Sequence, residues 1–371
     1  MALALSLLAV AGLVFIAVLL ADGVRVLLVR RRREAAARPL ELVVRERHEA
    51  AGHLVRLTLV RAEGGRLPPF AAGQYVLLQA PAGRGGKAVQ RAYSLAAWTS
   101  APRHYELGIK REGKGLVSGW VWDTLQTGSR VALLPPKGDF VLAPDAAGEL
   151  VLIAGGIGIT PLRAMLHAAL AAGRQRRIVL FHATRSAAEL LYHDEFQVLA
   201  ATLANFSYRP LLSRPAADWI GESGRLDATR LLAAVHAPMD AAFYLCASGA
   251  LMDAVRIGLL GAGIGETRIH WEAFGVAATG DASSGQRIAL EHGERSHDLL
   301  TAGEPTLLAA LETHELAPPA ECRAGNCGQC RMRLLDGEVR WLMKPEVALA
   351  DGDILPCICT AVGDVRLEAA V

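Results

Sequence analysis

The sequence has few aromatic residues, almost no net charge and no histidine pattern typical of a metal enzyme. Phe, Trp and Tyr make up 5% of the 371 residues, and Lys plus Arg exceed Asp plus Glu only by 39 to 37. A balance this even gives no electrostatic basis for binding nucleic acid. The eleven histidines show no zinc-site spacing such as His-Glu-x-x-His. The length predicts two or three domains rather than one.

Cysteine is also scarce, but its placement is informative. Six cysteines are too few for a disulfide framework in a chain of this length. Cys322, Cys327 and Cys330 have the spacing C-x4-C-x2-C, and Cys357 follows at a distance. Four thiolates bind a [2Fe–2S] cluster, and this asymmetric spacing is the plant-type ferredoxin pattern. Structural zinc fits less well, because zinc sites usually have two C-x2-C-like pairs.

The sequence leaves the fourth cluster ligand open and places two glycines inside the cluster loop. The fourth cluster ligand is either Cys357 or Cys359, and the sequence Leu355-Pro356-Cys357 favours Cys357. Gly325 and Gly328 lie inside the loop, where glycine permits positive φ and a close approach of the backbone to a cluster.

A long apolar run opens the chain. Residues 1–21 contain no charged side chain, and four arginines follow at residues 30–33. About 20 apolar residues can span a bilayer as a helix, and basic residues flank spans on the cytoplasmic side. A secretory signal peptide would have its charges before the run. We therefore predict a membrane anchor with a basic flank at residues 1–33, bilayer contact through residues 1–29, and a single-pass inner (cytoplasmic) membrane protein.

Residues 38–147 have alternating apolar residues and frequent turns, which predict a small antiparallel β-barrel. Inside this region lies Arg91-Ala92-Tyr93-Ser94. Arg91 could pair with a flavin phosphate, Tyr93 could lie against the isoalloxazine or ribityl chain, and Ser94 could hydrogen-bond the flavin N5. The alternative is an ordinary strand with an exposed arginine.

A strand, a turn and a helix start come next in the chain. A helix N-terminus can receive phosphate oxygens through its free N–H groups. The candidate cofactor-binding residues here are Lys110, Gly115, Val117 and Ser118.

Residues 148–277 begin with the apolar run Leu150–Ala154, typical of a strand buried on both faces. A glycine-rich turn and a helical stretch follow, which is the geometry that binds dinucleotide phosphates and predicts a Rossmann-like α/β domain. The candidate residues of the turn are Gly155, Gly156, Gly158, Thr160 and Pro161. Arg185 and Ser186, after the second strand, could accept a 2′-phosphate and would favour NADPH over NADH; the alternative is a solvated arginine.

The order of these motifs resembles the ferredoxin-NADP reductase-like flavoproteins that carry a C-terminal [2Fe–2S] domain and serve oxygenases, hydroxylases and desaturases. The resemblance implies that Cys246 faces the nicotinamide, Glu272 lies near the hydride path and Phe274 lies near the flavin. With Ser94, Cys246 and Glu272 are the candidate catalytic residues. Where the family usually has Cys-Gly-Pro, this chain has Cys246-Ala247-Ser248, which puts the geometry of that loop in doubt.

Residues 278–286 are small and polar and predict a linker, and residues 287–371 resemble a β-grasp (α+β) ferredoxin domain. A nicotinamide donates two electrons at once, whereas the cluster accepts one, so a flavin must stand between them. The sequence thus predicts an NAD(P)H-dependent reductase with FAD (or FMN) and a [2Fe–2S] cluster, serving a membrane-bound terminal oxygenase, hydroxylase or desaturase. The alternatives are a quinone-reducing membrane dehydrogenase and a non-enzymatic anchored carrier.

Overall fold

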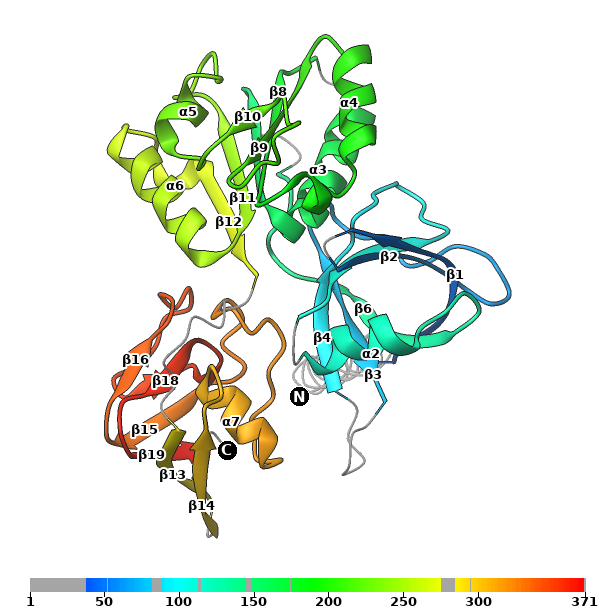
Figure 1. Ribbon diagram of the computed structural model, residues 1–371. Coiled ribbons are helices and arrows are strands. Elements are labelled where there is room, and N and C mark those ends of the chain that lie inside the picture. Colours follow the sequence, from blue (N-terminus) through cyan, green and yellow to red (C-terminus); the bar gives the residue numbers. More distant parts are fainter. Residues whose placement is uncertain are drawn as a thin grey trace, which may run out of the picture.

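The computed structural model shows three folded domains that meet at a common junction (Figure 1). The flavin-side barrel, the nucleotide-side α/β domain and the C-terminal domain follow one another in the chain. The structure describes residues 38–51, 53–81, 89–112, 115–143, 148–173, 175–274, 284–293 and 295–369.

The first domain is a six-stranded antiparallel barrel with strand order β4-β3-β6-β1-β2-β5. An antiparallel bridge between Leu95 and Leu107 joins the two outer strands. Alternate strand residues fill the interior, as the sequence predicted. The elements are β1 (Leu40–Ala50), β2 (Leu54–Val60), β3 (Tyr75–Ala80), β4 (Val89–Ser94), β5 (Tyr105–Lys110), α2 (Leu116–Thr124) and β6 (Arg130–Lys137).

The second domain is a parallel sheet with strand order β10-β9-β8-β7-β11-β12, packed between helices. The strand order reverses between β7 and β11, and crevices at such switch points bind ligands in α/β folds. Its elements are β7 (Leu150–Gly155), η1 (Gly156–Gly158), α3 (Ile159–Ala171), β8 (Ile178–Thr184), η2 (Ala187–Glu189), α4 (His193–Thr202), β9 (Phe206–Leu212), β10 (Glu222–Ser223), α5 (Ala228–Leu232), β11 (Ala242–Ala247), α6 (Gly249–Gly261), η3 (Glu266–Arg268) and β12 (Ile269–Ala273).

The third domain is a mixed sheet with strand order β14-β13-β19-β15-β17, in which the parallel pair β13 and β19 is central. This is the β-grasp arrangement that the sequence predicted. Its elements are β13 (Ser284–His292), β14 (Arg295–Ala302), α7 (Leu307–Thr313), β15 (Met332–Asp336), β16 (Val339–Trp341), β17 (Asp353–Ile354), η4 (Pro356–Ile358), β18 (Cys359–Ala361) and β19 (Val365–Ala369). The predicted linker falls mainly on residues 275–283, outside the described residues.

The prediction of a transmembrane helix as part of the fold is wrong. In the described ranges, no helix is long and apolar enough to cross a membrane. The longest of these helices, α3 and α6, have 13 residues each, or about 20 Å of helix where a bilayer core needs about 30 Å. The apolar run that carried the prediction, within residues 1–37, lies outside the described residues. The predicted single-pass membrane location loses its support with it.

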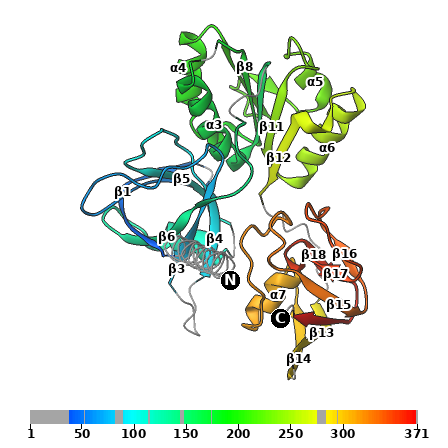
Figure 2. The ribbon, with the colours of Figure 1, turned by 180° about the vertical axis from the view of Figure 1, so that it is seen from behind.

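The three domains are joined very differently. Leu54, Ala72 and Ala96 of the barrel belong to the same buried core as α3 and its neighbouring strands. Among the described residues, the ferredoxin-like domain shares one small apolar cluster with the nucleotide-side domain, formed by Met252, Ala273 and Ala324. In both views it lies below the other two domains, with α7 turned toward the barrel (Figure 2). The barrel and the α/β domain therefore form one body, and the third domain is more lightly attached.

Candidate functional site

The four cysteines predicted as cluster ligands lie together in two pairs. The Cys327 N–H donates to the Cys322 sulfur at 3.3 Å, and the two thiols are hydrogen-bonded. Cys330 and Cys357 form the second hydrogen-bonded pair. In the part of the chain that the structure describes, no three His, Cys, Asp or Glu side chains converge on one metal ion. Two thiol pairs instead suit a cluster of two irons, each held by two thiolates.

The loop has the shape that a cluster requires. Gly325 and Gly328 have φ of 76° and 68°, so the predicted positive φ is confirmed at both positions. A Cβ on Gly325 would lie 2.6 Å from the Ile358 side chain. The Cys359 sulfur turns away and donates to the Leu355 carbonyl at 3.3 Å. This geometry favours Cys357 over Cys359 as the fourth ligand.

The predicted flavin-binding side chains lie on β4, next to β3. Ser94 is buried and pairs with Tyr75 across the two strands. Burial raises the pKa of Tyr93. Arg91 donates to the Gln90 carbonyl at 2.8 Å and lies 3.7 Å from Glu312 of α7. Burial lowers the pKa of Arg91 to about 10, which still leaves it charged at neutral pH.

The N-terminus of α2 is the predicted phosphate site. Gly115 is its N-cap and provides no side chain to accept from the first turn, which also has no acidic residue. The Ser118 hydroxyl accepts from the Glu112 N–H at 3.1 Å, and Val117 is buried. These features leave the end of the helix suited to phosphate oxygens. Lys110, predicted to bind cofactor, lies 3.5 Å from Glu189 of the neighbouring domain.

The glycine-rich turn links β7 to α3 at the switch point. Gly156 has φ of 54°, and Pro161 lies in the first turn of α3. The Thr160 hydroxyl donates to the Ile157 carbonyl at 3.1 Å. A Cβ on Gly158 would collide with the Cys246 carbonyl. The turn therefore has the strand–turn–helix form on which the prediction of dinucleotide-phosphate binding was based.

The departure from Cys-Gly-Pro has a local explanation. A Cβ on Gly155 would lie 2.7 Å from the Ala247 Cβ. The missing side chain at 155 thus makes room for Ala247. Ser248 is the N-cap of α6 in an extended conformation, with φ of −69°. The loop after Cys246 therefore forms without the family's Gly-Pro.

Arg185 and Ser186 directly follow β8, beside the glycine-rich turn at the end of β7. The Arg185 side chain is exposed. The Ser186 carbonyl accepts from the Thr184 hydroxyl at 2.9 Å, which fixes the backbone of this corner. The pair is placed where a dinucleotide ribose is expected.

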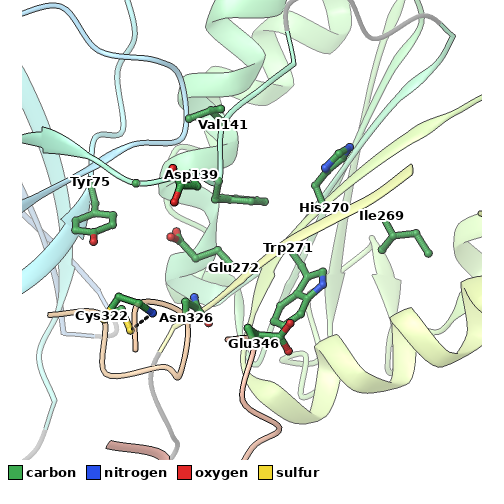
Figure 3. Close-up of a pocket in the computed structure, with 13 residues that line it drawn as sticks. Tyr75, Asp139, Val141, Ile269, His270, Trp271, Glu272, Cys322, Asn326 and Glu346 are labelled. Carbon is green, nitrogen blue, oxygen red and sulfur yellow. Dashed lines mark hydrogen bonds between the residues drawn. The ribbon is translucent and has the colours of Figure 1, made fainter. Parts of the chain in front are cut away.

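A cavity of about 360 Å³ lies where the three domains meet. Tyr75 and Gly138–Val141 line it from the barrel, and Ile269–Glu272 line it from β12. The cluster loop contributes Cys322, Asn326 and Cys327, and Glu346 completes the lining. Figure 3 shows Tyr75, Glu272, Cys322 and Asn326 around this space. Flavin-side, nucleotide-side and cluster residues therefore share one site.

The two predicted catalytic residues of the α/β domain are neighbours, and one of them, Glu272, lines this cavity. Cys246 pairs with Glu272 across β11 and β12, and burial raises the Cys246 pKa well above its usual range. Burial also raises the pKa of Glu272 to about 8. Phe274 packs against the core, and its N–H donates to the Ala247 carbonyl at 3.5 Å. At neutral pH the site thus holds a thiol and a mostly protonated carboxyl.

Comparison with known families assigns each domain. The model of the oxidoreductase FAD-binding domain matches residues 41–142, and that of the oxidoreductase NAD-binding domain matches residues 152–256. The model of the 2Fe-2S iron-sulfur cluster binding domain matches residues 293–362.

Two curated proteins match this chain over most of their own length. The glycine betaine monooxygenase reductase subunit of Pseudomonas aeruginosa is 28% identical, over 81% of this chain and 87% of that protein. The stachydrine N-demethylase reductase subunit Stc4 of Rhizobium meliloti is 26% identical, over 90% and 97%. The structure of the Amycolatopsis cytochrome P450 reductase GcoB is 31% identical, with a TM-score of 0.56 over 64% of this chain and 70% of that one. The chain belongs to the reductase components of oxygenases.

The fold agrees with that assignment. Phthalate dioxygenase reductase superposes with a TM-score of 0.68 over 89% of this chain and 98% of that one, at 24% identity. This reductase is an NAD(P)H-dependent oxidoreductase that passes electrons through FAD and a [2Fe–2S] cluster to an oxygenase. The predicted family, enzyme class and cofactors are confirmed.

Sequence reasoning missed Arg163, which joins the barrel to α3 of the reductase. Arg163 donates to the Ala96 carbonyl at 2.9 Å and to both Glu195 oxygens at 3.0 and 2.9 Å. It also stacks on Tyr192, 4.2 Å from the ring centroid. Ala96 is two residues from Ser94, so this arginine holds the flavin-side strand against the nucleotide-side helix. The available signal was an arginine on an otherwise apolar helix after the glycine-rich turn.

His182 supports the glycine-rich turn from β8. It is fully buried and its Nε2 lies 3.1 Å from the Gly156 carbonyl. Because a carbonyl can only accept, Nε2 donates. Burial lowers the pKa of His182 to about 4, so a neutral imidazole supports the glycine-rich turn.

We expect Glu272 to make stability depend on pH. Its pKa is about 8 when folded and near 4.5 when unfolded, so the folded state binds the extra proton between these values. The contribution of Glu272 to stability is then largest below about pH 4.5 and is lost as pH rises to about 8, by about 2 kcal/mol after allowing for partial exposure. Denaturant unfolding at pH 5.5 and 8.5 should show a smaller fall for Glu272→Gln than for the wild type. An equal fall in both would contradict the buried-carboxyl assignment.

Proposed function

We propose that the acceptor of this reductase is the separate oxygenase subunit of a multicomponent monooxygenase or demethylase. Two relatives that match along nearly their whole length are named as reductase subunits of such systems. The observation that carries the proposal is the shared cavity, where Cys322 and Cys327 of the cluster loop face residues of both reductase domains. The chain can thus bring hydride acceptance and one-electron release to one place.

Roles for the site residues follow from their positions. Bound FAD supplies the conversion between a hydride and single electrons. Ser94 would hold the reacting edge of the flavin, and Cys246 and Phe274 would shape the nicotinamide pocket. Glu272, in the cavity, would keep or release a proton near that edge. The flavin phosphates would meet Arg91, Gly115, Val117 and Ser118, with Tyr93 against the ring, and the nucleotide phosphates would meet Gly155, Gly156, Gly158, Thr160 and Pro161.

The deciding experiment is a visible spectrum of the purified protein under anaerobic conditions, before and after one equivalent of NADH or NADPH. Bleaching of both the flavin and the iron–sulfur bands would support the route. Bleaching of the flavin alone would contradict it. Cluster absorbance without flavin would indicate a carrier, and fast cluster-dependent reduction of a soluble quinone analogue would favour the dehydrogenase alternative.

Nucleotide preference gives a second prediction. If Arg185 contacts a 2′-phosphate, Arg185→Ala should raise the KM for NADPH about tenfold and leave the KM for NADH nearly unchanged, because one charge-assisted contact is lost. Steady-state reduction of ferricyanide with each nucleotide measures both constants. Arg209→Ala is the control, since Arg209 pairs with Glu222 on the next strand. Equal changes for both nucleotides would rule out 2′-phosphate recognition by Arg185.

A further inference from the structure

Three ion pairs between described residues attach the ferredoxin domain to the rest of the reductase. In each of the three, the acid belongs to the ferredoxin domain and the base belongs to the barrel or the α/β domain. The pairs are Arg91 with Glu312 at 3.7 Å, Lys137 with Glu321 at 2.5 Å and Arg256 with Glu346 at 3.8 Å. At these three pairs, the ferredoxin side of the interface is therefore acidic, and the side formed by the barrel and the α/β domain is basic.

The three carboxylates, here called the acidic rim, surround the cluster loop. Glu312 holds Arg323, the residue after Cys322, through two hydrogen bonds. Glu321 directly precedes Cys322. Glu346 donates its N–H to the Gly325 carbonyl at 3.2 Å and lines the same cavity as Cys322 (Figure 3). The acidic rim thus borders the loop that carries the candidate cluster ligands.

The partner cations lie around the flavin-side and nucleotide-side residues of the same cavity. Lys137 pairs across β6 and β3 with Tyr75, which lines the cavity. Arg256 of α6 stacks on Trp271 of β12, 4.0 Å from the ring centroid. A basic face on the reductase body therefore meets the acidic rim.

This attachment is weak enough to be reversible. The rim side chains keep 19–26% of their surface exposed, and partly exposed ion pairs contribute little and are screened by salt. The shared apolar cluster is small. By contrast, the barrel and the α/β domain share a continuous core. Rearrangement at the junction is therefore expected at the ferredoxin domain.

We propose that the acidic rim is also the surface that docks on the electron acceptor, whose redox centre would be bordered by Lys and Arg. The inference rests on the proposed function. A rim covered by the basic face cannot bind an acceptor at the same time, so the two docking events alternate. Glu312 is already paired with Arg323. Recognition of the acceptor therefore depends on Glu321 and Glu346, although Lys344 is a cation near Glu346.

Cytochrome c, a basic protein with an exposed haem edge, is a suitable acceptor probe. The acid variant carries Glu321→Gln and Glu346→Gln, and the base variant carries Lys137→Gln and Arg256→Gln. Both should slow transfer from flavin to cluster in stopped-flow absorbance, because both break the same two ion pairs. Only the acid variant should raise the KM for cytochrome c, by about fivefold at low salt, and flatten its salt dependence.

The control variant carries Glu338→Gln and Glu368→Gln, two exposed carboxylates outside these ion pairs, and should leave both quantities unchanged. An unchanged KM in the acid variant, or an equal rise in the base variant, would overturn the proposal. Cluster absorbance checks that Glu321→Gln leaves the neighbouring cluster intact. Ferricyanide reduction by NAD(P)H tests the flavin step separately: if it is absent in the wild type, the proposed function fails, whatever the rim does.

Discussion

Replacement of Cys357 by serine is expected to abolish the [2Fe–2S] cluster, whereas the same change at Cys359 should leave it in place. The Cys357 thiol pairs with Cys330 and packs beneath the cluster loop. The Cys359 sulfur donates to the Leu355 carbonyl inside a different core cluster. Reduction of cytochrome c should fall by about a hundredfold or more in Cys357→Ser, because one iron loses a thiolate.

Iron and sulfide analysis and the visible spectrum measure the cluster directly. Reduction of ferricyanide by NAD(P)H, which needs only the flavin, should stay within about twofold of wild type in both variants. Cys359→Ser is the matched control, because its hydroxyl can donate to the same carbonyl. A cluster retained in Cys357→Ser and lost in Cys359→Ser would reassign the fourth ligand.

Arg163→Met should destabilise the body formed by the barrel and the α/β domain more than a substitution of the exposed Arg185 or Arg209. The variant leaves Glu195 partly buried without its main partner and leaves the Ala96 carbonyl without its donor. Breaking a buried charge pair costs about 3–5 kcal/mol. For domains of this size, that corresponds to a fall in Tm of about 6–20 °C.

Differential scanning fluorimetry of the holoprotein would measure the shift. The control Arg209→Met removes an exposed ion pair with Glu222 and should change Tm by less than about 2 °C. Since Ala96 lies close to Ser94 in sequence, flavin reduction by NAD(P)H should also slow in Arg163→Met at temperatures where the variant is folded. A stable variant with normal flavin reduction would show that Arg163 does not hold the flavin-side strand against α3.

The parts of the site that sequence revealed are those set by local chemistry. The spacing of Cys322, Cys327 and Cys330 specifies a ligand loop, and Gly325 must have positive φ within it. Gly158 follows an apolar strand and precedes a helix, a geometry that requires the absence of a side chain. The barrel, the parallel sheet and the β-grasp domain were likewise visible in short-range patterns. The membrane helix was the failure: an apolar run and its basic flank predicted it, but no helix in the described ranges is long and apolar enough to cross a membrane.

Contacts between distant segments could not be predicted in this way. Arg91 was interpreted as a phosphate ligand, yet it also faces Glu312, which lies 221 residues later in another domain. Lys110 was interpreted similarly and pairs with Glu189. The raised pKa of Glu272 depends on burial at a three-domain junction, which no local pattern records.

The sequence by itself determined the three domain types, the cluster ligands apart from the choice between Cys357 and Cys359, and the glycine-rich turn. Each of these depends on residues close together in the chain, where backbone geometry and ligand spacing act directly. Only the tertiary structure decided which way Cys359 points, how Arg163 joins two domains, and that the acidic rim meets cations from both. Those features arise from groups brought together by packing, and apart from the contact of Cys359 with Leu355 their partners lie far apart in the chain.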